Sequence, residues 1–437
     1  MNPTPRAEHS PPASTAPTMY DYLIVPRAPL VFRSGRPFGV GGRDAAHFPW
    51  PSSLAGLLRT QVLDDRSEAY AAAHAATAAG DTGDTGDTGA PPPWPGTVDR
   101  EQQRALRALA AHGPLLAHCC AGKITPMLPR PADAVLLADA HGAGAYQRLQ
   151  PGALPAGCGC DLPTGLRPLL LPPGAGKGKV QPGPRFWPLS TVLAWRRGAS
   201  VALPAHDEPP SETRTHVALA RNTLAADPGR LFQSDGLDFS PRRRADRHGF
   251  TVEQWIFLAR FAQDIAPRWV TFGGERRLSW LDTAPREVLA APPEHLAALA
   301  GARRLTLSLA TPALFAAGWR PAWLNDDLCG CPPACPALQL RLVAAAVDGW
   351  LSVSGWDLVA AGDGAGRPTA GAKAARKAVP AGATYWFEVI GAPPDDWAER
   401  LWLAPIADDE QDRRDGFGLV IPGLWPTPQQ QGEESAC

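Results

Sequence analysis

The chain has 437 residues, 44% of them hydrophobic, and a formal net charge of −1 at pH 7. This length exceeds the usual size of one domain and is ample for a buried core, so we expect two domains. The balanced charge excludes a uniformly basic nucleic-acid-binding surface, and any such site must be a local patch. No run of about 18 apolar residues occurs, so we expect no membrane-spanning helix.

Two further features of composition bear on the cellular setting. Residues 1–18 are rich in proline, serine and threonine and lack the apolar stretch of a signal peptide, so we expect a disordered tail and a cytoplasmic protein. The eight cysteines are too few for a disulfide framework in so long a chain. Their two clusters, CGC at 158–160 and CGCPPAC at 329–335, depart from the common C-x2-C spacing of zinc sites, so free thiols are expected, and four thiolates that bind a structural zinc are the alternative. No metal and no cofactor is predicted.

The first third of the chain alternates strand and helix signals. Residues 20–32 predict a strand, because β-branched and aromatic residues dominate them. The loop RSGRPFGVGG follows, and Ser53 then caps a predicted helix whose leucines recur at helical spacing. The stretch 66–96 contains a GDT triplet repeat that cannot pack a core, so we expect a solvated insertion there, followed by a helix over 97–112.

The remaining elements are predicted from capping and apolar patterns. Thr251 and Gln254 fit a capping box, which predicts a helix that carries Trp255 and Leu258. A further helix is expected over 284–300, interrupted at its two adjacent prolines. Apolar runs rich in β-branched and aromatic residues predict strands at 305–310, 339–346, 384–390 and 417–421.

One motif occurs twice. Residues 29–37 read PLVFRSGRP and residues 312–321 read PALFAAGWRP, and each copy follows an apolar strand signal. In both, a phenylalanine lies three residues after the proline, a glycine lies six residues after it, and Arg-Pro closes the motif. Coincidence in a chain rich in proline and arginine is the alternative. Two copies of one αβ module explain the pattern better and place a domain boundary near residue 300.

Nine segments, in order along almost the whole chain, together resemble a known family. They are PLVFRSGRPFGVGG, FPWPSSLAGLLRT, LPRPADAVLL, TRTHVALARNTLAADPGRLFQSDGLDF, FGGERR, LATPALFAAGWRPAW, VSGWDL, KAVPAGATYWFE and DGFGLVIPGLW. The chain resembles the RAMP superfamily, and within it the family formed by the third subunit of the Cmr complex, the type III-B CRISPR effector.

This resemblance implies both a fold and a role. The implied fold is α+β, with two ferredoxin-like (RRM-type) domains and long loop insertions: one domain over 19–300 with its insertion near 66–96, the other over 301–437 with a glycine-rich loop. The implied role is to bind the 5′ tag of the guide RNA (crRNA), to dock on the large polymerase/cyclase-like subunit and to contact the backbone subunits. The family member is not itself an enzyme, which leaves RNA binding and assembly as the expected function.

Glycines and basic residues are the candidate RNA contacts. Gly416 and Gly418 interrupt a predicted strand and offer backbone N–H groups to phosphates, and Phe417 between them can stack on a base. A tight strand bend with a core Phe417 is the alternative. The basic and aromatic residues proposed for RNA lie in three segments: Arg33, Arg36, Phe38 and Arg43; Arg214 and His216; and Lys373, Arg376 and Lys377. For these basic loops, an ordinary solvated surface or an acidic protein neighbour is the alternative.

Two other functions remain open from the sequence. Related RAMP proteins cut repeat RNA without a metal, and His47 is the best-placed histidine for such acid–base chemistry, although no partner is evident near it. A purely architectural subunit is the third possibility. Nucleotide-binding motifs are absent, because neither PPGAGKGKV nor GVGGRD has the spacing of a phosphate-binding loop.

Overall fold

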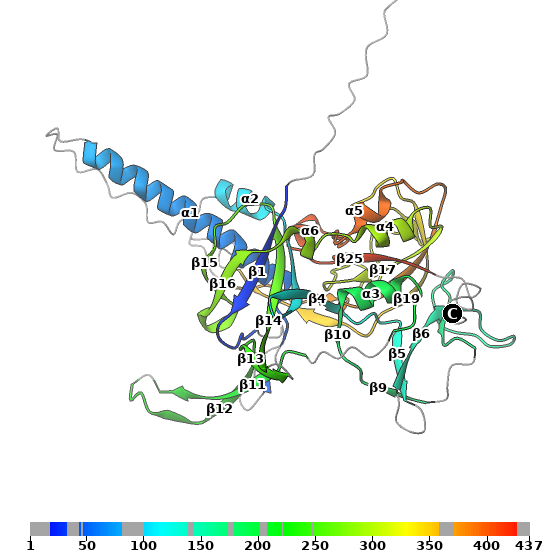
Figure 1. The fold of residues 1–437 in the computed structure, drawn as a ribbon, viewed down its shortest axis with the longest axis horizontal. Helices are drawn as coiled ribbons and strands as arrows, with labels where there is room; N and C mark the ends of the chain where they lie inside the picture. The colour runs from blue at the N-terminus through cyan, green and yellow to red at the C-terminus, as the bar shows by residue number, and fades with distance from the viewer. Residues whose placement is uncertain are drawn as a thin grey trace, which may run out of the picture.

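The computed structural model of the chain has a mixed α+β fold, rich in strands and built on several antiparallel sheets (Figure 1). It describes residues 18–32, 43–44, 47–80, 100–138, 144–173, 178–201, 208–220, 222–246, 249–357 and 371–425. The candidate RNA contacts Arg33, Arg36 and Phe38, the terminal tail over 1–17 and the GDT repeat lie outside these residues. Within the described part, no helix has the length and apolar character needed to cross a membrane.

The larger sheet has eight strands in the order β10-β4-β3-β14-β1-β16-β15, with β13 also pairing with β14. Its strands are β1 (Tyr20–Pro26), β3 (Ala111–Cys120), β4 (Lys123–Pro129), β10 (Phe186–Pro188), β13 (Arg242–Asp246), β14 (Gly249–Phe261), β15 (Arg268–Phe272) and β16 (Arg277–Thr283). One face packs on α1 (Pro51–Gly80), because Tyr22 and Ile24 of β1 share a buried cluster with Leu54 and Leu58 of the helix. Beyond this contact α1 extends away from the body (Figure 1).

The second sheet has five strands in the order β18-β19-β24-β17-β25. These are β17 (Arg304–Leu309), β18 (Cys329–Gly330), β19 (Leu340–Ala346), β24 (Thr384–Val389) and β25 (Val420–Leu424). Alternating residues such as Leu305 and Leu307 enter a core that α4 (Pro293–Leu299) and α5 (Trp397–Leu401) cover with Leu299 and Trp397. The sheet therefore has its own core, distinct from the one under α1.

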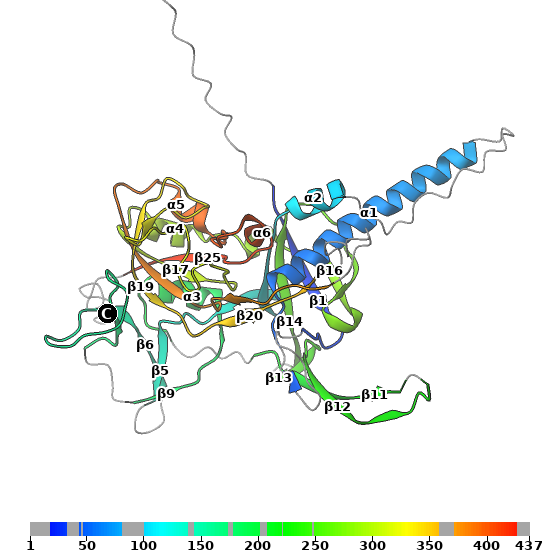
Figure 2. The same cartoon turned by 180° about the vertical axis from the view of Figure 1, so that it is seen from behind.

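Smaller elements decorate the two sheets. A hairpin of β11 (Ser211–Leu219) and β12 (Ala226–Leu237) extends from the body as an arm, and β2 (Arg43–Asp44) pairs with β12 (Figures 1 and 2). The other strands form short sheets: β5 (Ala134–Ala138), β6 (Gly144–Arg148) and β9 (Lys179–Gln181); β7 (Gln150–Pro151) and β8 (Leu169–Leu170); β20 (Leu351–Val353) and β23 (Arg376–Ala378); β21 (Trp356–Asp357) and β22 (Gly371–Ala372). The remaining helices are α2 (Arg100–Ala108), α3 (Leu189–Arg196), α6 (Glu410–Arg414), η1 (Gly274–Arg276) and η2 (Arg286–Val288).

A third buried cluster joins the two sheets. It contains Leu115 and Leu128 from the larger sheet, Ile421 from the smaller one and Val192 from α3 between them. Close to it, the guanidinium of Arg196 pairs with the carboxylate of Asp133, and both side chains are at most 2% exposed. Gly423 of β25 lies where a Cβ atom would be only 2.7 Å from the Cβ of Arg196, so a larger residue there would separate α3 from the sheet.

The strands predicted in the second half are confirmed as β17, β19, β24 and β25, although the last begins at Val420 rather than at 417. The predicted strand over 20–32 ends at Pro26, and the helix predicted over 97–112 ends at Ala108 because β3 begins at Ala111. The helix predicted from Ser53 begins at Pro51 and continues to Gly80, which places part of the expected insertion inside α1.

The helix predicted at Thr251 was wrong, because these residues form the central strand β14. Trp255, Ile256, Phe257 and Leu258 are all buried, two on each face of the sheet. A strand buried on both faces reads as a continuous apolar run, without the alternation that distinguishes strand from helix. The region 284–300 is helical only in η2 and α4.

The described starts of the two proline motifs make similar backbone contacts. Leu30, the residue after the first proline, exchanges two backbone hydrogen bonds of 2.9 and 2.8 Å with Leu237 at the end of the β11–β12 arm. Ala313, the residue after the second proline, exchanges bonds of 3.0 and 2.8 Å with Val379, just beyond the β20–β23 hairpin. In each sheet the segment leaving the first strand is thus anchored to an inserted hairpin.

Candidate nucleic-acid interface

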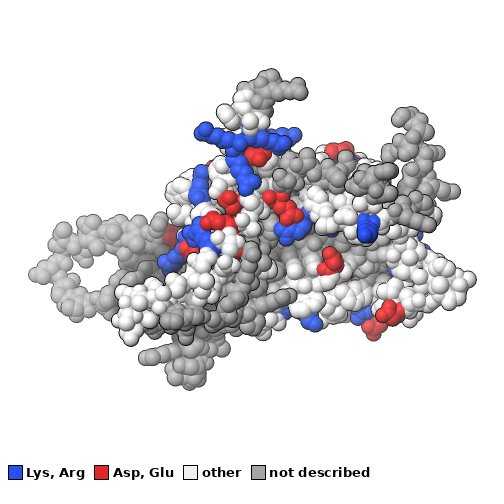
Figure 3. All heavy atoms as spheres, turned by 90° about the horizontal axis from the view of Figure 1, so that it is seen from below, with Lys and Arg blue, Asp and Glu red and all other residues white. Residues whose placement is uncertain are grey.

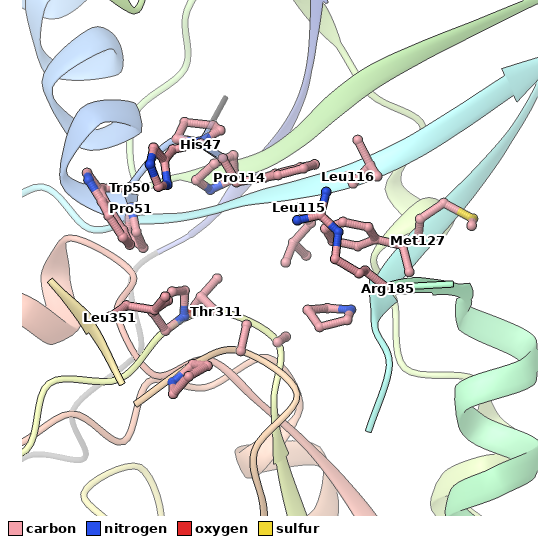
Figure 4. Close-up of a pocket in the computed structure, with 18 of the residues that line it drawn as sticks. His47, Trp50, Pro51, Pro114, Leu115, Leu116, Met127, Arg185, Thr311 and Leu351 are labelled. Carbon is pink, nitrogen blue, oxygen red and sulfur yellow. The ribbon is translucent and has the colours of Figure 1, made fainter. Parts of the chain in front are cut away.

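A cavity of about 320 Å³ lies between the two sheets. The larger sheet contributes residues of β3, β4 and β10, and the smaller one contributes the segment after β17 and the loops at 348–351 and 380–381. Figure 4 shows Leu115, Met127 and Arg185 on one side, Thr311 and Leu351 on the other, and His47 and Trp50 at one end. The cavity therefore exists only because the two halves pack together.

The walls are apolar, and the charged groups are few. Trp50, Met127 and Phe186 supply ring or thioether surface, and several prolines add flat apolar faces. Arg185 donates from Nε to an oxygen of Glu208 at 2.6 Å, so its charge is already paired. Arg130 is half-buried and has no carboxylate partner among the described residues. This combination of flat apolar surface and one unpaired cation is suited to a planar, anionic ligand.

His47 lines one end of the cavity (Figure 4). The described residues that line the cavity with it include neither tyrosine nor lysine, and the one carboxylate among them is that of the exposed Asp348.

A smaller pocket of about 210 Å³ adjoins the start of α1. Ser52 and Ser53 of the first helical turn line it together with Lys373 and Arg376. Arg376 donates two hydrogen bonds of 2.7 Å to the two oxygens of Asp412, and this pairing raises the pKa of the guanidinium. Of the three cations predicted in this loop, Lys373 thus faces the pocket with its ammonium unpaired by any described carboxylate, while Arg376 is shared with Asp412.

Lys377, the third predicted cation, lies elsewhere. Its Nζ atom is 5.2 Å from the centre of the Trp350 ring, which is a cation–π contact at the surface. The neighbouring residues of β23 alternate in direction, as expected for a strand, so Arg376 and Lys377 leave opposite faces of the hairpin. The loop therefore does not present its three charges to one ligand in this conformation.

The glycine segment has a structural explanation within the chain. Gly416 (φ +89°) lies so close to β3 that a Cβ atom would be 2.6 Å from the carbonyl oxygen of Ala111, and its own carbonyl accepts a 2.7 Å hydrogen bond from Thr311. Gly418 (φ +77°) packs against the backbone of Ala407. Gly416 is therefore required where the two halves meet, and Gly418 is required for close packing within the second half.

The prediction that Phe417 stacks on a base is corrected by the burial of its ring. The ring is 1% exposed and packs in a cluster with Trp50, Leu314 and Val353. It is therefore a core residue, the alternative that the sequence left open, and its face is covered by the protein. Because Trp50 belongs both to this cluster and to the cavity wall, Phe417 supports the cavity from behind.

The arm carries the remaining predicted residues. Arg214 donates from Nε to Glu212 at 2.8 Å, and this hydrogen bond raises its pKa. The ring of His216 stacks on Phe232 with centroids 5.0 Å apart, and its Nε2 lies 2.7 Å from the hydroxyl of Ser234. Arg43 lies in β2, paired with β12, although its side chain is not described. These residues share the arm and are separate from the cavity.

Charge is unevenly distributed over the surface. Seen from below, basic side chains gather on the side of the molecule that carries the arm, with acidic side chains between them (Figure 3). The strand β13, which pairs with β14, carries three consecutive exposed arginines, Arg242 to Arg244.

Sequence reasoning missed most of the cavity. Arg130 and Arg185 are isolated arginines in loops, and no spacing connects them with each other or with Trp50. The segment FPWP was noted only as part of a family resemblance, yet it forms one end of the cavity. Among the described residues, no three or more His, Cys, Asp or Glu side chains are grouped so that they could hold a metal ion, and this holds for the two cysteine clusters as well.

Comparison with known proteins gives a clear assignment. The chain has no match among curated proteins. Two solved structures of the type III-B Cmr-β complex bound to cognate target RNA contain similar chains, one with AMPPnP at 12% identity and TM-score 0.38, the other at 13% and 0.36; each comparison covers 84% of this chain and 86% of the other. These values are low, so the assignment rests on the sequence match of residues 22–425 to the CRISPR-associated protein family Cas_Cmr3. Since that match spans most of its length, the chain belongs to the Cas_Cmr3 family.

Proposed function

We propose that this chain is the non-catalytic subunit of a type III-B Cmr effector complex that binds the 5′ tag of the crRNA and helps to assemble the complex. Family membership supports the complex, and the cavity between the two sheets is the observation that carries the RNA-binding role. Docking on the large polymerase/cyclase-like subunit and on the backbone subunits follows from the same proposal.

The proposed scaffold is a pair of ferredoxin-like domains joined near residue 300. Four strands of the larger sheet lie side by side in the order β3-β14-β1-β16, and every neighbouring pair is antiparallel. If these four strands are numbered 1 to 4 along the chain, the order is 2-3-1-4. The strands β17, β19, β24 and β25 have the same order and directions. This order is that of the βαββαβ unit.

Each half retains one of the two helical crossovers of that unit. In the first half α1 connects β1 to β3, and in the second half α5 and α6 lie between β24 and β25. In the described residues, the connection from β14 to β16 contains β15 and η1, and the connection from β17 to β19 begins with an irregular segment. We therefore interpret the two motif copies as the same exit loop in two related domains, and their meeting surface as the origin of the cavity.

In the proposed binding mode the cavity holds one unstacked base, and cations at its edges hold the adjoining phosphates. The indole of Trp50 and the ring of Phe186 offer apolar surface to a base. Arg130 at one side and Lys373, beside the first turn of α1, have no carboxylate partner among the described residues and are available to phosphates. The partial positive charge at a helix N-terminus adds to that of Lys373.

Filling the cavity tests this function. Ala381→Trp places a large ring in the cavity wall from a half-buried loop, and Ala297→Trp on the exposed side of α4 is the matched control. Base stacking in single-strand sites is worth about 1–3 kcal/mol, so Ala381→Trp should weaken binding of tagged crRNA to the assembled complex about tenfold or more. Unchanged affinity, with the same preference for the native over a scrambled tag, would refute the proposed site.

A further inference from the structure

Arg276 lies in a turn whose backbone is unfavourable for its residue type. The turn connects β15 to β16 and has the sequence Gly273-Gly274-Glu275-Arg276. Glu275 (φ +60°) and Arg276 (φ +50°) both occupy the left-handed region, which a Cβ atom disfavours and glycine does not. Two consecutive strained residues that are not glycine persist only where the surroundings or a function require them.

Contacts fix this turn against the residues that precede the Gly/Arg loop, which is the segment RSGRPFGVGG over 33–42. The N–H of Gly274 donates to the carbonyl oxygen of Val31 at 2.8 Å, and a Cβ atom on Gly273 would be 3.1 Å from the Phe32 ring. Phe32 in turn packs edge-on against Phe272, with ring centroids 5.0 Å apart. Arg33, the first residue of that loop, therefore follows directly from the residues that this turn holds.

Arg276 is an exposed cation that makes no ion pair or hydrogen bond with the described residues. The next residue, Arg277, pairs with Glu275, and Arg214 of the arm pairs with Glu212. Glu275 thus uses its side chain within the protein, whereas the side chain of Arg276 has no contact with the described residues that would explain why the position is not glycine.

We propose that Arg276 contacts a phosphate of the bound single-stranded RNA beside the Gly/Arg loop, and that the strained turn serves to present it. The inference rests on the proposed function and extends the RNA path from the cavity to the far edge of the larger sheet. A guanidinium that no described residue engages is the side chain best suited to phosphate. The contact would add affinity without sequence preference.

Replacing Arg276 with glycine gives two readouts of opposite sign. Arg276→Gly removes the strain and the cation together, so the midpoint of thermal unfolding should rise by about 2–4 °C while crRNA binding by the assembled complex weakens about tenfold. The slope of log affinity against log salt should become shallower by about 0.7, the value for one phosphate contact on a single strand. Arg276→Lys keeps the charge and should retain the slope.

Each other result overturns the inference. A raised midpoint with unchanged RNA affinity would make Arg276 a residue without an RNA role, and a lowered midpoint would refute the argument from strain. Loss of incorporation into the complex in the absence of RNA would assign Arg276 to a protein partner instead. If Ala381→Trp weakens tag binding and Arg276→Gly does not, this inference fails and the proposed function stands. If neither variant weakens binding, both fail.

Discussion

Removing the carboxylate of Asp133 should destabilise the protein strongly, because it would leave a buried charge without its partner. Arg196 is 2% exposed, and its guanidinium pairs with Asp133, which is 1% exposed. The other oxygen of Asp133 accepts a 3.1 Å hydrogen bond from the indole of Trp195. Breaking a buried pair from one side costs about 3–5 kcal/mol, a large share of the usual stability of a folded protein.

Equilibrium unfolding in urea, followed by tryptophan fluorescence, measures this effect. Asp133→Ala should lower the free energy of unfolding by about 4 kcal/mol, whereas Asp161→Ala, at an exposed position, should change it by less than about 0.5 kcal/mol. The double variant Asp133→Leu with Arg196→Met removes both charges and should be more stable than Asp133→Ala alone. A loss below about 1 kcal/mol in the single variant, or no recovery in the double variant, would refute the reasoning.

Three further outcomes follow from single residues. Burial, and then the charge of Arg260, lowers the pKa of His112 from 6.5 to about 4. As the pH falls, the unfolded chain therefore takes up that proton first, so the contribution of His112 to the free energy of unfolding is full above about pH 6.5 and declines toward pH 4. Urea midpoints measured across this range should decline less for His112→Gln than for the unaltered chain. Tyr22→Phe removes the hydroxyl that accepts from the N–H of Ile265 at 2.7 Å, which should cost about 1–3 kcal/mol in urea unfolding, and an unchanged midpoint would contradict it. Gly423→Ala places a Cβ atom 2.7 Å from the Cβ of Arg196, and this overpacking should destabilise the protein by about 1–3 kcal/mol. Differential scanning fluorimetry should therefore show a lower melting temperature, and an unchanged melting temperature would contradict the prediction.

The sequence was most informative where the apolar pattern has one interpretation. The strands β17, β19 and β24 were predicted within one or two residues, because each is a short run of β-branched or aromatic residues between turn signals. At Thr251 the same local signals predicted a helix, and the central strand β14 is set by its neighbours β1 and β3 rather than by its own pattern. Pairing with residues more than a hundred positions away has no local signal.

The candidate site was less accessible to sequence reasoning for the same reason. Phe417 between two glycines resembles an exposed stacking residue, but the glycines permit close packing against Ala111 and Ala407, and this packing buries the ring. No local sequence pattern marks Arg130 as a site residue. It lines the cavity only because the loop at 380–381, from the other half, lines the same cavity. The repeated proline motif was the one sequence feature that related the two halves, and the residue after each of its prolines, Leu30 and Ala313, exchanges two backbone hydrogen bonds with a residue at the end of a hairpin.

The most direct test of the account is photo-crosslinking of the guide RNA in the assembled complex. A crRNA whose 5′ tag carries 4-thiouridine would be irradiated in the complex, and the crosslinked peptides of this chain would be identified by mass spectrometry. We expect crosslinks within residues 47–53 and 373–376, which line the two pockets. Crosslinks confined to the α4–α5 side of this chain, or to other subunits only, would contradict the claim that the tag is held between the two sheets.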